Sequence, residues 1–314
     1  MRLRVFFFAL CLLFTQHLFA AEPLIEPHEA VALLQQYNVQ AIDIRSGEDY
    51  SAGHIPGAIS APYALWRGPA HNPGALANTE ELQTLVRKLG LTNKQHLVVY
   101  SSGADDTDFG AAARVYWTLK YLGFSHLSVL NGGYKYWQKQ ASHSVENTTN
   151  QLANSTVQVN VQPQLVVFKD ELVEKINSPE AAYQLLDARP IMFYQGQMKA
   201  PTASTAGTIA SAQNVTFQQW FVDGETLVRP ASEIKTLVAE QGLNQAPETL
   251  SFCNTGHWAA TNWFVLSEIA ELENVRLYPA SLAEWTQHPE ALPMENTPTR
   301  SEQIKAKFQQ LFKK

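Results

Sequence analysis

The stretch Thr249-Leu-Ser-Phe-Cys-Asn-Thr-Gly-His-Trp-Ala-Ala260 passes from an apolar run into a loop and then into a helical pattern. It predicts a strand that ends just before Cys253 and a helix that begins near Trp258. Ligand sites of parallel α/β sheets lie at the carboxyl ends of strands, so we expect Cys253 to stand at such a site. Loop N–H groups and the start of the helix would face the sulfur and stabilise negative charge there.

The count of cysteines adds to this expectation. The chain has two, Cys11 and Cys253, and Cys11 lies in a predicted leader. The mature protein would then hold one thiol, which is either buried and inert or exposed and used. Free cysteines are often small core residues. The position on a strand-to-helix turn beside Gly256 favours a solvent-reachable, reactive thiol instead.

Residues 1–20 have the pattern of a secretory signal peptide. Arg2 and Arg4 precede an apolar run over residues 5–14, and Ala20 offers a small residue at the cleavage point. The run is short for a membrane span. We therefore expect a protein of the periplasm or a secreted one, with no membrane contact after cleavage.

Length and composition indicate a globular protein of two domains. The chain has 314 residues, of which 45% are hydrophobic and 11% aromatic. The net charge is −6 and no basic stripe is visible. Nucleic acid is therefore not an expected partner.

The order of predicted elements occurs twice. Asp43, Ser101 and Trp137 find counterparts in Asp187, Cys253 and Trp285, each roughly 150 residues later. Strands alternate with helices in both halves, which predicts an α/β fold of two tandem domains. Each would be a mostly parallel sheet with helices on both faces. We place the domains at residues 22–141 and 165–295, a polar linker at 142–164 and a tail at 296–314.

These residues resemble the rhodanese family of sulfurtransferases in its tandem, two-domain form (the thiosulfate or 3-mercaptopyruvate type). The motifs that carry the resemblance besides the cysteine loop are Asp43-Ile-Arg45, Gly53-His-Ile-Pro-Gly-Ala58, Asp187-Ala-Arg189 and Trp220-Phe-Val-Asp-Gly224. The resemblance implies two rhodanese-like domains, of which the first is catalytically inactive. Ser101 would stand in the first where Cys253 stands in the second.

The resemblance also implies a sulfurtransferase. Cys253 would take a sulfane sulfur from thiosulfate or 3-mercaptopyruvate, become a persulfide, and pass the sulfur to a thiol or to cyanide. No cofactor and no metal are implied. Arg189 would bind substrate, and a cradle of loop amides would hold the sulfur. The cradle residues are Asn254, Thr255, Gly256, His257, Trp258 and Ala259.

The chain departs from the family pattern where charge is concerned. Trp258 stands where single-domain relatives usually have an arginine, and Phe193 stands where a second arginine is expected. Thr208 replaces a histidine. His257 alone would bring a partial charge to the loop, so we expect the charge pattern to affect the choice of donor.

Other interpretations stay open at this stage. A cysteine phosphatase or arsenate reductase is disfavoured, because it would need an arginine at the end of the loop, where Trp258 stands. A cysteine hydrolase would need a base histidine and an orienting residue, and His257 is too near Cys253 in sequence to orient freely. The main alternative is a non-enzymatic sulfur carrier or partner-binding protein. Arg189 could equally be an ion-pair partner of Asp187, and His257 could face solvent. Trp258 could pack against its neighbours rather than bind a ligand.

Overall fold

The computed structural model describes residues 21–139, 144–178, 180 and 182–299. The predicted signal peptide with Cys11 lies outside these residues, as do the first two residues of the predicted linker and most of the predicted tail.

The first half forms one parallel sheet with the strand order β1-β5-β4-β2-β3. Its central strands are apolar and buried on both faces, as helix-covered parallel strands require. The elements in chain order are β1 (Leu24–Ile25), α1 (Pro27–Leu34), β2 (Val39–Asp43), α2 (Gly47–Ala52), β3 (Ile59–Ser60), η1 (Tyr63–Trp66), α3 (Thr79–Lys88), β4 (His96–Tyr100), α4 (Phe109–Tyr121), β5 (Leu127–Leu130) and α5 (Gly133–Lys139).

The second half repeats this arrangement with the strand order β10-β9-β6-β8, again parallel. A short antiparallel pair, β7 with β11, is added at its side. The elements are η2 (Pro163–Leu165), α6 (Lys169–Asn177), β6 (Gln184–Asp187), α7 (Ile191–Tyr194), β7 (Thr208–Ile209), β8 (Ala212–Asn214), η3 (Phe217–Trp220), α8 (Ala231–Glu240), β9 (Thr249–Phe252), α9 (Trp258–Phe264), η4 (Val265–Ile269), β10 (Val275–Leu277), α10 (Ser281–Trp285) and β11 (Met294–Glu295).

Four strands of the first sheet, β5-β4-β2-β3, correspond in order to β10-β9-β6-β8 of the second, which confirms the predicted tandem α/β fold. Strand β4 lies between β5 and β2, and β9 lies between β10 and β6. Ser101 directly follows β4 as Cys253 directly follows β9. The duplication thus places a serine and a cysteine at equivalent ends of two central strands.

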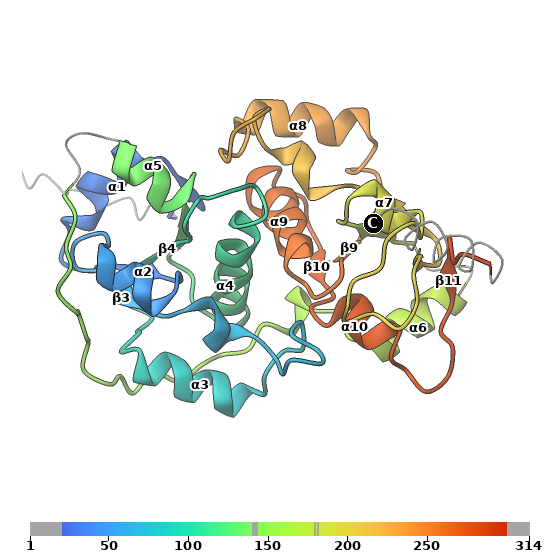
Figure 1. Cartoon of the computed structure of the whole chain (residues 1–314), viewed down its shortest axis with the longest axis horizontal. Coiled ribbons are helices and arrows are strands. Elements are labelled where there is room, and N and C mark those ends of the chain that lie inside the picture. The colour runs from blue at the N-terminus through green and yellow to red at the C-terminus, as the bar shows by residue number, and fades with distance from the viewer. Residues whose placement is uncertain (1–20, 140–143, 179, 181, 300–314) are drawn as a thin grey trace, which may run out of the picture.

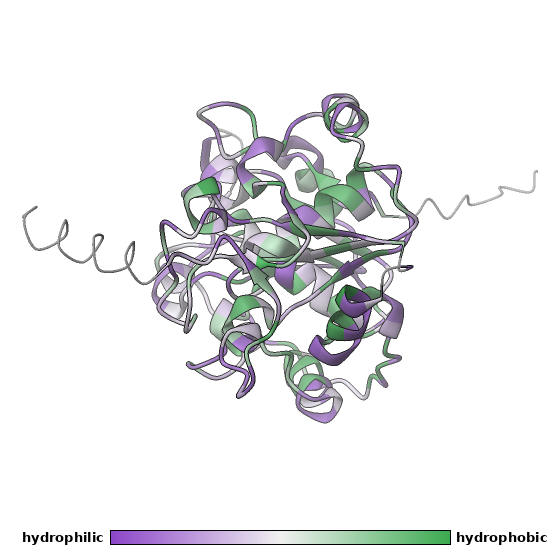
Figure 2. Cartoon of the chain, turned by 90° about the vertical axis from the view of Figure 1, so that its right-hand side faces the viewer, coloured by the Kyte–Doolittle hydropathy of each residue, from purple (hydrophilic) through white to green (hydrophobic). Residues whose placement is uncertain are grey.

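Helices α4 and α9 lie side by side between the halves (Figure 1). Phe109 of α4 meets Phe221 and Phe264 edge to face, with ring centroids 5.6 and 5.5 Å apart. The Lys120 ammonium and the Glu268 carboxylate form an ion pair of 2.6 Å across the same seam. One continuous apolar core therefore joins the two halves. In Figure 2, hydrophobic and hydrophilic segments are interspersed along the helices and strands.

The segment predicted as a linker is extended and packed along the first half. His54 and Glu146 exchange backbone hydrogen bonds of 2.8 and 2.9 Å. The Arg87 Nε donates to the Val157 carbonyl at 2.8 Å. From Val157 to Val161 every second residue is partly buried, so alternation of apolar side chains anchors a stretch whose composition is mostly polar.

The helix that the sequence predicts from Trp258, over residues 258–271, is shorter and less regular in the structure. Regular α-helix covers Trp258–Phe264, and a π-helical turn, η4, follows over Val265–Ile269. Within the described residues, no helix has the length and apolar character needed to cross a bilayer.

Candidate functional site

Cys253 stands at the carboxyl end of β9, in the middle of the second sheet. Its neighbour β6 ends in Asp187, so the two side chains leave the same edge of the sheet. The Cys253 side chain is 1% exposed. The expected solvent-reachable thiol is therefore not found in this arrangement, because segments of the first half cover the loop.

A serine that the sequence did not single out shapes the cysteine loop. The backbone N–H groups of Cys253 and Gly256 both donate to the Ser281 Oγ, each at 3.1 Å, and this hydroxyl donates to the Tyr278 carbonyl at 2.8 Å. Gly256 has φ +66°, which suits a residue without Cβ. Ser281 has φ +54°, an uncommon conformation for a residue with a Cβ. The loop is thus curled around the first turn of α10.

The remaining loop amides are available to an anion. In the described part of the chain, no protein acceptor takes the N–H groups of Asn254, Thr255, His257, Trp258 and Ala259. Consecutive N–H groups on a curled loop at the start of a helix form a concave site that favours negative charge. The amide of Gly256, which we expected in the same cradle, is instead taken by the Ser281 Oγ.

Arg189 lies against the loop but its guanidinium is largely occupied. Its Nε and Nη2 bond the Asp187 carboxylate, with the closest contact at 2.6 Å, and Nη2 also donates to the Gly207 carbonyl. Only Nη1 reaches the loop, at 3.4 Å from the Asn254 Oδ1. Arg45 makes the same contacts with Asp43 and Gly53 in the first half. This geometry supports a positioning role for Arg189, and its predicted contact with substrate stays a prediction.

Aromatic side chains stand where the family pattern has charge. The Trp258 ring stacks on Phe217 with centroids 5.1 Å apart and an angle of 5°, and Phe193 of α7 meets it edge-on at 6.0 Å. The Trp258 Nε1 is buried without a hydrogen-bond partner. Thr208 donates to the Asp187 carboxylate at 2.7 Å. This side of the loop is therefore packed and uncharged.

His257 binds the first half of the chain rather than facing solvent. Its Nε2 lies 2.6 Å from the Thr107 carbonyl, so this nitrogen carries a proton. Its Nδ1 then accepts from the Tyr63 hydroxyl at 3.1 Å, and that oxygen accepts from the Arg67 Nη1 at 2.9 Å. Burial, assisted by Arg67, lowers the pKa of His257 to about 4. The ring is thus neutral near pH 7, and the partial charge expected from it is absent.

Two glycines of the first half allow its backbone to pack directly against the cysteine loop and the neighbouring Pro279. A Cβ on Gly74 would lie 2.3 Å from the Pro279 carbonyl oxygen and 2.8 Å from the Thr255 backbone. A Cβ on Gly110 of α4 would lie 2.9 Å from the His257 carbonyl oxygen. Atoms cannot approach so closely without displacement, so glycine is required at both positions.

Arg114 of α4 brings a full charge to the back of the loop. Its Nη1 lies 3.3 Å from the Gly256 carbonyl oxygen and its Nη2 donates to the Gly74 carbonyl at 2.9 Å, while Nε has no partner. The side chain is 0% exposed. Burial lowers the pKa of Arg114 to about 10; Arg67 lowers it further, whereas Tyr63 and Cys253 act in the opposite direction.

The sequence analysis missed all of these first-half groups. The sequence of α4 held one available signal, because Arg114 is the one charged residue in the run of small, apolar and aromatic residues over 109–119. Arginine is almost never fully buried unless it is paired. No sequence signal placed Tyr63 or Arg67 beside His257, since that contact joins segments almost two hundred residues apart.

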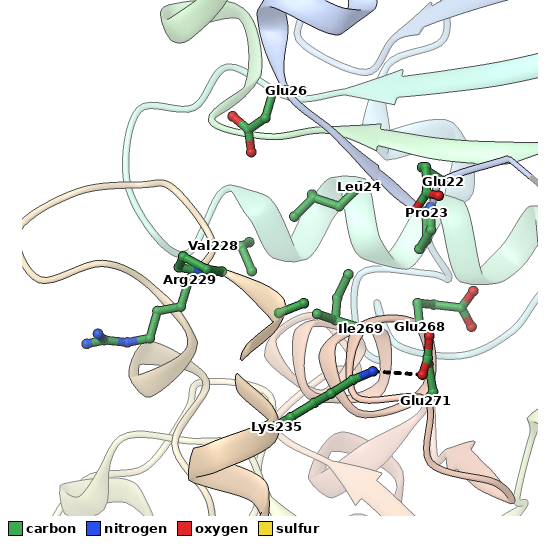
Figure 3. Close-up of a pocket in the computed structure, with 12 residues that line it drawn as sticks. Glu22, Pro23, Leu24, Glu26, Val228, Arg229, Lys235, Glu268, Ile269 and Glu271 are labelled. Atoms are coloured by element: carbon green, nitrogen blue, oxygen red, sulfur yellow. Dashed lines mark hydrogen bonds and ion pairs between the residues drawn. The ribbon is translucent and has the colours of Figure 1, made fainter. Parts of the chain in front are cut away.

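A separate pocket lies between the halves, away from the cysteine loop (Figure 3). It is bordered by residues 22–26, 228–235 and 268–271, and its Lys235 is ion-paired with Glu271 at 2.7 Å. Its lining holds no cysteine, histidine, serine or threonine. Among the described residues, no group of three or more His, Cys, Asp and Glu side chains is placed to hold a metal ion.

Comparisons with known proteins also find two similar halves. The family model for the rhodanese-like domain matches residues 26–140 and again 168–288. A protein of Saccharopolyspora erythraea, provisionally named thiosulfate sulfurtransferase, is 29% identical over 257 residues, which are 79% of this chain and 86% of that protein. The 3-mercaptopyruvate sulfurtransferase of Escherichia coli K12 is 27% identical over 245 residues, covering 77% of this chain and 84% of that protein.

Among solved structures, the chain is similar to an anaerobic ergothioneine biosynthesis enzyme from Chlorobium limicola. The TM-score is 0.75 at 21% identity, over 88% of this chain and 71% of that chain. This likeness shows the shared fold.

Proposed function

The chain belongs to the rhodanese-like family and carries two copies of the domain in tandem, and on that premise we propose that this sulfurtransferase works through a persulfide on Cys253. The donor is a small sulfane-sulfur or mercapto compound of the thiosulfate or 3-mercaptopyruvate kind, and the acceptor is a thiol or cyanide. The relatives whose names include these two donors motivate the choice.

In the first step, the Cys253 thiolate attacks the outer sulfur of the donor. A bond forms between the two sulfurs, and the donor bond to the transferred sulfur breaks. Thiosulfate releases sulfite with the electron pair; 3-mercaptopyruvate releases the pyruvate enolate, which takes up a proton. In the second step, the acceptor attacks the outer sulfur of the persulfide, and the Cys253 thiolate returns.

The observation that carries this proposal is the position of the one described cysteine at the start of a loop whose amides are mostly unpaired. Those of Asn254, Thr255, His257, Trp258 and Ala259 are free, and Cys253 stands at the start of the loop. Such donors stabilise the negative sulfur of both thiolate and persulfide without reorganisation. Arg189 supports the loop through Asn254.

Steady-state kinetics with each donor test the proposal. We expect thiocyanate from thiosulfate and cyanide, or pyruvate from 3-mercaptopyruvate and a thiol, with parallel double-reciprocal lines. Cys253→Ser should abolish both reactions. Equal turnover by the wild type and this variant would refute the assignment.

A sulfur carrier is the alternative outcome of the same experiment. The near-complete burial of Cys253 favours it, because a closed loop would protect a persulfide from small acceptors. A carrier would load one sulfur on Cys253 and show no multiple turnover.

We also propose that the protein acts outside the cytoplasm, on the basis of the leader pattern in residues 1–20. Recovery of the chain in the periplasm or medium, with its leader removed, tests this. Retention of full-length chain in the cytoplasm would refute it.

A further inference from the structure

The uncharged cysteine loop poses a question of charge balance. A thiolate, a persulfide and a thiosulfate ion are all anionic, yet Trp258, Phe193 and the neutral His257 bring no cation to them. In the first half, by contrast, two arginines lie near the cysteine loop, and neither is paired with a carboxylate. Arg67 and Arg114 take part in no ion pair among the described residues.

Of the two unpaired arginines, Arg114 is the more unusual, because it is fully buried. A fully buried cation without an opposite charge is costly, and such groups are normally paired. Its partners are two neutral carbonyl groups, those of Gly74 and Gly256, and the face of Trp117 at 5.2 Å. Its Nε has no hydrogen-bond acceptor. An anionic sulfur on Cys253, as thiolate or persulfide, would be the negative charge that balances the Arg114 guanidinium.

Arg67 lies close enough to His257 to act on it electrostatically, as Arg114 does, and is partly exposed. Its guanidinium lies 5.1 Å from the centre of the Tyr63 ring and donates to the Tyr63 hydroxyl, which in turn bonds His257. Because Arg114 is 0% exposed, an entering molecule cannot contact it. Arg67 is the cation that an entering anion can reach.

We propose that Arg67 and Arg114 of the first half form the cationic part of the Cys253 site, and that they make it selective for anionic reactants. Arg114 balances the charge of the sulfur from behind the loop, and Arg67 attracts the anionic group of the donor. The half that lacks the cysteine thus supplies the charge that the loop itself lacks. This inference rests on the proposed function and deepens it by naming the first-half residues that recognise the negative charge of the donor.

Alkylation with a matched pair of reagents tests the inference without requiring turnover. Iodoacetate is anionic and iodoacetamide is neutral, and both react with the same thiolate. We expect the ratio of their rates at Cys253 to exceed that of a small model thiol, and to fall as ionic strength rises. Arg67→Gln should lower the ratio on the order of tenfold. A purely structural change alters both rates together and leaves the ratio as it was.

Arg87→Gln is the matched control. Arg87 is also a partly exposed arginine of the first half, but it donates to the Val157 carbonyl and not to a group that contacts the cysteine loop. It should keep the wild-type ratio. Arg114→Met should lower the ratio and Arg114→Lys should largely keep it. If Arg114→Met does not fold, the rate ratio of Arg67→Gln and the salt dependence of the wild-type ratio test the inference.

An unchanged ratio in folded Arg67→Gln, with no salt dependence in the wild type, would overturn the inference. That result would leave the proposed sulfur transfer intact, because transfer is measured separately. Conversely, a shifted ratio without sulfur transfer would retain the cationic site and refute the function.

Discussion

Substitution of Gly74 by alanine tests whether the first half holds the cysteine loop in place. The new Cβ would lie 2.3 Å from the Pro279 carbonyl oxygen and 2.8 Å from the Thr255 backbone. Normal contact needs about 1 Å more than the shorter distance, and both obstacles are backbone. The first-half segment must therefore move away from the loop.

The expected cost is that of overpacking, ~1–3 kcal/mol of unfolding free energy. Movement of Gly74 also disturbs its carbonyl bond to the Arg114 Nη2, now 2.9 Å long. We therefore expect lower sulfur transfer together with faster alkylation of Cys253 by iodoacetamide. Urea unfolding, donor kinetics and alkylation rates give the three values.

Gly47→Ala is the control, because a Cβ at this position meets nothing within 4 Å. It should leave stability, sulfur transfer and alkylation close to those of the wild type. If Gly74→Ala matched Gly47→Ala in all three measurements, the reasoning about the covered loop would be refuted.

Three further predictions concern the loop and its supports. The pKa of His257 is lowered from 6.5 to about 4. As the pH falls, His257 is therefore protonated in the unfolded chain before it is protonated in the folded chain. About 3 kcal/mol of unfolding free energy should be lost between pH 6.5 and pH 4. Urea unfolding should show this loss in the wild type and a flatter profile in His257→Gln; equal profiles would contradict it. Ser281→Ala leaves the buried N–H groups of Cys253 and Gly256 without their acceptor and should cost ~1–3 kcal/mol for each. Unchanged thermal unfolding would contradict that. Arg189→Lys and Arg45→Lys should destabilise the fold similarly, because each removes a bidentate contact between a guanidinium and an aspartate. Only Arg189→Lys should slow sulfur transfer. Equal kinetics of the two variants would refute the positioning role of Arg189.

The sequence was informative where interactions are local. The apolar run before Cys253 predicted β9 at its observed bounds, Thr249–Phe252, and the repeated Asp-x-Arg strand ends predicted two similar sheets. Periodicity and turn residues report on neighbours along the chain, which suffices for strands, helices and the position of a thiol at a strand end. The short elements α7, β7 and β8 carry too few residues to show a period.

The charge and access of the site were not predictable in this way. Ser281 reaches the loop from the turn after β10, and Tyr63, Arg67 and Arg114 reach it from the other half. Such contacts depend on how two sheets pack, which one sequence does not encode in any local pattern. The same packing explains why Cys253 is covered when its loop alone indicated exposure.

Intact-mass measurement after incubation with thiosulfate or 3-mercaptopyruvate tests the central claim most directly. We predict that the chain gains the mass of one sulfur atom, that peptide mapping places it on Cys253, and that cyanide removes it. A wild-type chain that gains no sulfur from either donor, or a Cys253→Ser chain that gains as much, would contradict the account.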